Sequence, residues 1–312
     1  MFVRADSKPI VLFVGLVVAL ETALFSTKAQ AAQSESDGLH IRVGAYNVSF
    51  FSEAPATEIG TMLESFDLDI AGLTETPRAP ATSDIANATG ANHFVAGTIS
   101  SGQSADKLKG IVSHTPLSSA SEINLSASQG GFVGGGESAT HANTEIGGFN
   151  ISVYCLHISD GVLEPMEKLL SNPGFASDDA DVILVIGDFN AQLFHPQMEL
   201  IMAEGFRPSW YDLDIDVSQT KTYDLLPGRG PGGITRDEGV IDHIMFKSKD
   251  GIDVEAVQGG IFSAMTEQGD PMSDHAMIWA ELVIHSTPEP NGIHLLAMGL
   301  LGLLGSRRRR HK

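Results

Sequence analysis

The stretch Val182–Ala191, VILVIGDFNA, decides the fold. Its apolar run predicts a strand at Val182–Gly187. Asp188 and Asn190 stand where this strand becomes a loop. A lone Asp-Phe-Asn at such a place is usually a turn, because these side chains bond their own backbone. Matching residues elsewhere are therefore needed before it indicates a site.

Other apolar runs predict the remaining elements. We expect strands at His40–Val48, Asp69–Leu73, Lys109–Ser113, Gly147–His157, Ile241–Phe246 and Met277–Ile284. Helical spacing of apolar residues predicts helices at Ala56–Phe66 and Leu163–Leu170. Strand runs with two helix-bearing crossovers favour an α+β domain of two packed sheets flanked by helices.

Polar side chains stand at the ends of these strands, where they can converge on a cleft. In chain order they are Asn47, Glu75, His157, Asp188, Asn190, Asp242, Asp274 and His275. Carboxylates with amides and imidazoles suit a hard cation such as Mg²⁺, which takes one or two carboxylates and keeps positions open for phosphate oxygens. The one cysteine, Cys155, excludes an intramolecular disulfide and a cysteine-based zinc site, and we expect it to be buried.

The order of these motifs carries a resemblance to a family. GAYN, LTE, YCLH, GDFNA, IDHI and SDHA are spread over residues 41–284, and GDFN followed by SDH is the most specific pair. The chain resembles the endonuclease/exonuclease/phosphatase family, whose members share the pancreatic deoxyribonuclease fold. The resemblance implies a four-layer α/β/β/α sandwich of two packed mixed sheets flanked by helices. It also implies metal-dependent hydrolysis of phosphate esters.

The resemblance assigns roles to individual residues. Glu75 would be the main metal ligand, with Asn47 beside it and Asp274 as a second candidate for metal contact. Asp188 and Asn190 would orient the attacking water and hold the phosphate. The expected ion is Mg²⁺, with Mn²⁺ or Ca²⁺ as alternatives.

Two histidines complete the expected site. His275 would act as a base or an electrostatic partner, fixed by a hydrogen bond to Asp242, and His157 would meet the phosphate or the leaving oxygen. A carboxylate behind a histidine fixes the tautomer of its ring. His243 alternates out of phase with Asp242, so we expect it to be packed or solvent-facing.

The sequence departs from the family pattern at the phosphate-facing cation. His114 stands in the turn Ser113–Pro116 where relatives often place Arg, so that cation is either absent or replaced by His114. We expect Lys107 and Lys109 at the surface, the latter within reach of a phosphate. Tyr223 is the candidate for the tyrosine that some members place near the phosphate.

Charge limits the substrates. Residues 33–287 hold 11 Lys and Arg against 36 Asp and Glu, which disfavours a protein that coats nucleic acid but permits a cation-filled cleft. We expect a monomer that cleaves phosphodiester bonds of nucleic acid. A phospholipid or inositol-phosphate enzyme is the alternative, with Trp210–Tyr211 as the aromatic pair to enter lipid. The second alternative is a non-catalytic surface-binding protein on the same scaffold.

The N-terminus predicts export. Arg4 and Lys8 precede the apolar run Ile10–Leu20, and Ala29-Gln30-Ala31 follows, which is the layout of a signal peptide over residues 1–31. A membrane anchor is the alternative, although 11 apolar residues fall short of the roughly 20 needed to span a bilayer.

The C-terminus also predicts a sorting segment. A Pro-Glu-Pro tripeptide at residues 288–290 precedes the apolar Ile293–Leu304 and four arginines at residues 307–310. This order resembles the PEP-CTERM sorting signal of Gram-negative bacteria, which implies an exosortase-type processing enzyme and membrane attachment before processing. We expect a catalytic domain at residues 32–287, a sorting segment at 288–312, and a protein displayed at the cell surface or released outside a Gram-negative-type bacterium.

Overall fold

The structure is a computed structural model that describes residues 38–49, 54–99, 107–128, 136–217, 220–223 and 239–287. Contacts divide the chain into the units Met1–Leu39 and His40–Lys312, and the elements below belong to the second apart from the first residue of the first strand. The segments 1–31 and 288–312 lie outside the described residues, so both targeting segments stay predictions. Within the described ranges, no helix is long and apolar enough to cross a membrane.

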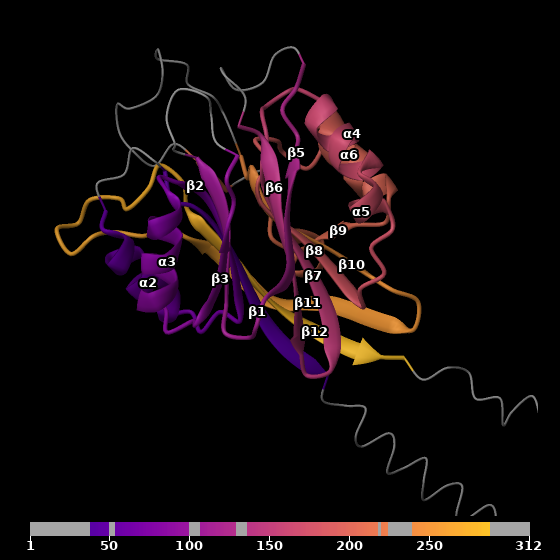
Figure 1. Ribbon diagram of the computed structural model, residues 1–312, viewed down its shortest axis with the longest axis horizontal. Coiled ribbons are helices and arrows are strands. Elements are labelled where there is room, and N and C mark those ends of the chain that lie inside the picture. Colours follow the sequence, from indigo (N-terminus) through magenta and orange to yellow (C-terminus); the bar gives the residue numbers. More distant parts are fainter. Residues whose placement is uncertain are drawn as a thin grey trace, which may run out of the picture. The chain divides into compact units, whose positions relative to one another are not determined.

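Two six-stranded sheets face each other (Figure 1). The first contains β1 (Leu39–Asn47), β2 (Ile70–Thr76), β3 (His93–Ala96), β4 (Leu108–Ser113), β11 (Ile252–Phe262) and β12 (Met277–Ser286), in the order β11-β12-β1-β2-β4-β3. The second contains β5 (Ser118–Asn124), β6 (Ser138–Ile146), β7 (Phe149–His157), β8 (Val182–Asp188), β9 (Arg207–Pro208) and β10 (Asp242–Ser248), in the order β5-β6-β7-β8-β10-β9.

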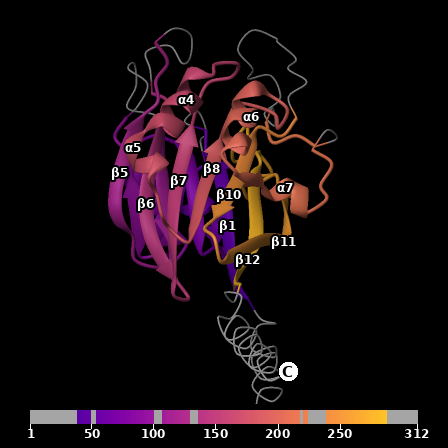
Figure 2. The same cartoon turned by 90° about the vertical axis from the view of Figure 1, so that its right-hand side faces the viewer.

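Helices form the outer layers. On the outside of the first sheet lie α2 (Ala56–Glu64) and α3 (Ala79–Ala88) (Figure 1). Over the second sheet lie α4 (Glu164–Ser171), α5 (Pro173–Ala176), α6 (Pro196–Ala203) and α7 (Ser209–Asp212) (Figure 2). The predicted four-layer sandwich of two mixed sheets is confirmed.

A parallel pair of strands in each sheet positions the site. β1 runs parallel to β2, and β7 runs parallel to β8 with His157 opposite Asp188. Because β10 is antiparallel to β8, it begins where β8 ends, and Asp242 lies opposite Asp188. The carboxyl ends of both parallel pairs therefore carry the polar residues that the sequence places there.

Glycine allows the two sheets to approach closely at this point. A Cβ on Gly72 of β2 would lie 2.7 Å from the side chain of Ile186 and 3.1 Å from Cys155 Sγ. Cys155 is fully buried, as expected, and burial raises the pKa of its thiol to about 12. At the end of β8, Gly187 has φ +128°, and a Cβ there would collide with the carbonyl oxygen of Leu156. Only glycine therefore fits immediately before Asp188.

The structure corrects two local expectations. The predicted strand Gly147–His157 begins with a turn at two positive-φ glycines, and β7 starts at Phe149 after its unpredicted hairpin partner β6. Lys109 is not at the surface: it is fully buried, and its Nζ donates to the carbonyl of Gly136. Burial lowers the pKa of Lys109 to about 8. The alternation of β4 points this lysine between the sheets rather than outward.

Candidate active site

Asp188 lies at the centre of the polar cluster and is almost fully buried. Asn47, at the end of β1, donates a hydrogen bond of 2.9 Å from Nδ2 to Asp188 Oδ2. The same Nδ2 lies 3.3 Å from Nε2 of His275, and Asn47 Oδ1 accepts from the backbone N–H of Ser49. The side-chain amide of Asn47 therefore links the C-terminal end of β1 in the first sheet to the C-terminal end of β8 in the second.

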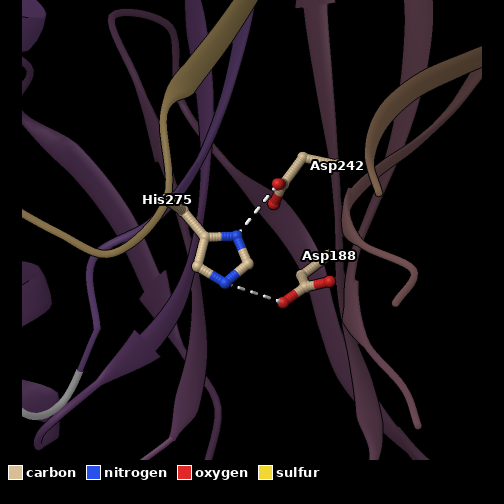
Figure 3. A group of neighbouring side chains, drawn as sticks. All are labelled: Asp188, Asp242 and His275. Atoms are coloured by element: carbon tan, nitrogen blue, oxygen red, sulfur yellow. Dashed lines mark hydrogen bonds and ion pairs between the residues drawn. The ribbon is translucent and has the colours of Figure 1, made fainter. Parts of the chain in front are cut away.

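His275 lies between two carboxylates (Figure 3). Its Nδ1 is 2.9 Å from Oδ2 of Asp242, and its Nε2 is 3.7 Å from Oδ2 of Asp188. Burial alone would lower the pKa of His275, but the two negative charges raise it to about 10. Burial raises the pKa of Asp188 to about 7, and the charge of Asp242 adds to the rise. The cluster thus pairs a charged imidazole with a carboxyl group that titrates near neutral pH.

His157 connects this cluster to the first sheet. Its Nε2 lies 3.4 Å from Oδ2 of Asp188 and 3.6 Å from Oε1 of Glu75. Burial and then the positive charges of Lys107 and Lys109 hold the pKa of His157 well below 6.5. This ring is therefore neutral where that of His275 is charged.

Glu75 stands at the end of β2 with a left-handed backbone, φ +57°. Its Oε1 lies 2.6 Å from Nζ of Lys107. Lys107 is partly exposed, but its charge also pairs with a site residue. Sequence reasoning missed this contact.

The other two predicted residues lie beside the cluster. Asn190 donates its backbone N–H to Oδ1 of Asp188 at 2.8 Å, and its side-chain Nδ2 donates to the carbonyl of Ile158 at 2.8 Å. Asp274 is half-buried, and its Oδ1 lies 3.4 Å from the hydroxyl of Ser273. Asn190 therefore orients Asp188 directly, whereas the role of Asp274 stays a prediction.

The cluster offers carboxylate oxygens to a divalent cation, whereas His275, whose pKa is raised, is protonated and offers a cation no lone pair. Ligand atoms of Asp188, Asp242 and His275 lie within 4.8 Å of one another. Oδ1 of Asp242 is buried and makes no hydrogen bond within the described ranges. A buried carboxylate oxygen without a donor is satisfied by a bound cation, and hard ions prefer oxygen. This group differs from the predicted ligands Asn47, Glu75 and Asp274, of which Asn47 contacts it directly.

Two aromatic residues near the site have different roles. The ring of Tyr223 lies 4.8 Å from that of His275, which keeps this tyrosine as a candidate for phosphate contact. Trp210 is 2% exposed and donates from Nε1 to Nδ1 of His243 at 3.0 Å. The expectation that Trp210 enters lipid is wrong, because α7 packs its ring against β10. His243 is packed, as expected.

The expected cation His114 lies at the wrong end of its strand. β4 is antiparallel to β2, so Ser113 pairs with Ile70 while Leu108 pairs with Thr76 beside the site. His114 follows Ser113 and donates its backbone N–H to the carbonyl of Asp69. His114 therefore lies at the end of the strands opposite to the candidate site, and it cannot face the phosphate.

A four-layer sandwich with an acid and histidine cluster where both sheets end defines the class of deoxyribonuclease-like α/β sandwich proteins. The chain belongs to the endonuclease/exonuclease/phosphatase family, whose sequence model matches residues 44–275. No curated protein matches the chain significantly.

Solved structures agree on the fold. A family member from Bacteroides vulgatus is 16% identical with a TM-score of 0.59, covering 78% of this chain and 98% of its own. D. rerio TDP2 with a single-strand DNA product is 12% identical with a TM-score of 0.58, over 78% and 98%. A mannosyl-6-phosphatase from Bacteroides thetaiotaomicron is 18% identical with a TM-score of 0.57, over 78% and 99%. At these identities the likeness shows the fold alone.

Proposed function

We propose that the chain is a divalent-metal-dependent phosphoesterase that hydrolyses phosphodiester bonds of nucleic acid. One observation carries the proposal: the buried imidazole of His275 lies between the carboxylates of Asp242 and Asp188 where the parallel strands of both sheets end. Hydrolysis of a phosphate ester needs an aligned water, a group that takes its proton and positive charge against the phosphate. The cluster has a group for each task.

Asp188 is the group suited to accept the proton of the attacking water. Burial raises the pKa of this carboxyl group in the metal-free protein, which makes its carboxylate a better proton acceptor. Asn47 and the backbone of Asn190 each hold one of its carboxylate oxygens. His275 supplies a fixed positive charge through Nε2, and Asp242 keeps that ring oriented through Nδ1.

Glu75 and Oδ1 of Asp242, which accepts no hydrogen bond from the described residues, offer the carboxylate oxygens that would hold the metal, with Asn47 beside them. A divalent ion contributes positive charge against the phosphate oxygens when it is bound. Neutral His157 lies between Asp188 and Glu75, so it is placed to donate a hydrogen bond to the phosphate or the leaving oxygen. We propose Mg²⁺ as the ion, with Mn²⁺ and Ca²⁺ as alternatives to compare.

The charge of the domain and the burial of one aromatic residue bear on the choice of substrate. Residues 33–287 hold 36 acidic against 11 basic residues, so a nuclease built on this domain would hold few phosphates at a time. Affinity for nucleic acid should then fall with salt with a log–log slope of about −2, against −6 or steeper for a basic binder. The phospholipid alternative loses support, since Trp210 is buried.

We also propose that the protein is exported and that its C-terminal segment is removed by a processing enzyme. The support is the order of charged, apolar and Pro-Glu-Pro elements at the two ends of the sequence.

The test is an activity assay on the full 312-residue chain. We expect Mg²⁺-dependent cleavage of DNA or RNA that chelator abolishes. Sphingomyelin, inositol phosphates and mannose 6-phosphate are the comparison substrates. Rapid hydrolysis of any of these without nuclease activity overturns the substrate, and absence of all hydrolysis favours a binding protein on the same scaffold.

A further inference from the structure

Lys107 borders the candidate active site through its contact with Glu75. Its Nζ is 2.6 Å from Oε1 of Glu75, and the side chain of Lys107 is 21% exposed against 10% for Glu75. Of the two side chains, that of Lys107 is therefore the more exposed.

The pairing of β2 with β4 holds the two residues together. Thr76 lies opposite Leu108, and the register shifts between Leu73 and Thr76. Glu75 and Lys107 precede the two members of this pair, and both have left-handed backbones, with φ of +57° and +76°. The irregularity directs both side chains to the same point at the sheet edge.

The charge of Lys107 acts on the side of the site where the phosphate is expected. After burial, Lys107 is the largest cause that lowers the pKa of His157, whose Nε2 lies between Glu75 and Asp188. Lys109 acts in the same direction, but it is fully buried and donates to the carbonyl of Gly136. Of these two lysines, Lys107 is the one that is partly exposed.

We propose that Lys107 is the substrate-binding cation of this site, stored on Glu75 in the metal-free protein and transferred to an oxygen of the substrate phosphate when Glu75 takes up its ion. The inference rests on the proposed function, because it assumes a phosphate substrate and a metal at Glu75. A divalent ion at Glu75 repels the ammonium, while a phosphate attracts it. Lys107 would thus supply the phosphate-facing cation for which the sequence offered His114.

Two opposite effects follow on removal of the charge. In Lys107→Met, Glu75 loses the cation that competes with the metal, so Mn²⁺ should bind about tenfold more tightly. Inorganic phosphate should bind the Mn²⁺-loaded protein about tenfold more weakly, because one charge-assisted hydrogen bond is lost. Both constants are measured by titration calorimetry on the full chain.

Two further variants control the experiment. Lys107→Arg keeps the charge and should restore most of the phosphate affinity. Lys249→Met removes a lysine that follows β10 at the opposite edge, where its Nζ lies 3.4 Å from the carbonyl of Asp179, and it should leave both constants unchanged.

The outcomes separate this inference from the proposed function. Unchanged phosphate affinity in Lys107→Met overturns the inference even if Mn²⁺ binds more tightly, because Lys107 would then be a counter-ion of Glu75 alone. Unchanged Mn²⁺ affinity in Lys107→Met would show that Lys107 does not compete with the metal for Glu75, and it overturns the inference. If the wild-type chain binds neither Mn²⁺ nor phosphate, the proposed function fails together with the inference.

Discussion

Two buried histidines on opposite sides of β10 have opposite electrostatics. His275 packs toward the sheet edge, where Asp242 and Asp188 raise its pKa to about 10. His243, the residue after Asp242, packs toward α7, where burial lowers its pKa to about 4. His243 accepts from Trp210 Nε1, so its other ring nitrogen carries the proton and donates to the carbonyl of Ala191 at 2.7 Å.

Burial is common to both histidines, so it does not distinguish a catalytic group from a packed one. The partners do: carboxylates stabilise the charged ring, whereas an indole N–H donor requires the neutral ring. Adjacent strand residues point to opposite faces, so one residue separates a functional environment from a structural one. Substitution of His275 should therefore lower activity, and substitution of His243 should lower the stability of the fold.

The largest effect is expected at Glu75. Glu75→Gln should lower turnover by about 10³-fold or more while the fold survives, because a neutral amide cannot balance a divalent charge. Turnover with saturating Mg²⁺ and the far-ultraviolet circular dichroism spectrum check the two halves of this statement. Full activity in the variant would remove Glu75 from the metal site.

His275 and Asp242 should behave as one unit. We expect His275→Ala to lower turnover about 10²-fold, and Asp242→Asn to cause part of the same loss, because the ring then lacks the carboxylate that orients it and stabilises its charge. The double variant should lose less than the product of the single losses. Losses that multiply would show that the two residues act independently.

The pH dependence of stability should separate the two histidines. The pKa of His243 is about 4 in the folded protein against 6.5 ordinarily, so stability is lost as pH falls from 6.5 toward 4, by about 3 kcal/mol. The pKa of His275 is raised instead, so its contribution is present below pH 6.5 and is lost as pH rises through its folded value.

Denaturant melts across pH measure these slopes on metal-free protein. His243→Asn should flatten the acid limb alone, and His275→Gln the alkaline limb alone. An unchanged acid limb in His243→Asn would mean that His243 is not held neutral.

The smallest effect is expected from the tail. Removal of residues 288–312 should leave turnover unchanged, because the candidate site ends at His275 and β12 at Ser286. Turnover and the thermal midpoint of the truncated chain check this. Unfolding of the truncated protein would show that the apolar segment contributes to the core.

The sequence was sufficient where local pattern determines structure. The continuous apolar run of β8 predicted both the central strand and Asp188 at its end, and both are found. α3 was missed because APATSDIANA is rich in small residues and has little apolar periodicity. β6 was missed because its buried residues include polar ones such as Ser138 and Thr140. In these elements burial follows from neighbours, which a local pattern does not contain.

The contacts around Glu75 were beyond prediction for a different reason. Lys107 lies 32 residues along the chain, and its position depends on the register of β2 against β4. The motif at Ser113–Pro116 was recognised by its residues, but strand direction decides at which edge it lies. Trp210 was nominated to enter lipid only in the phospholipid alternative, whereas the helix α7 turns it inward.

Metal-dependent catalysis by this cluster is tested most directly by the hydrolysis of bis(p-nitrophenyl) phosphate. The full chain is assayed in Mg²⁺ before and after chelation, with Glu75→Gln and His243→Asn in parallel. We expect chelation to abolish turnover and Glu75→Gln to lower it by about 10³-fold or more, while folded His243→Asn keeps it. Turnover that persists in chelator and in Glu75→Gln would contradict the assignment of metal-dependent catalysis to this edge of the sheets.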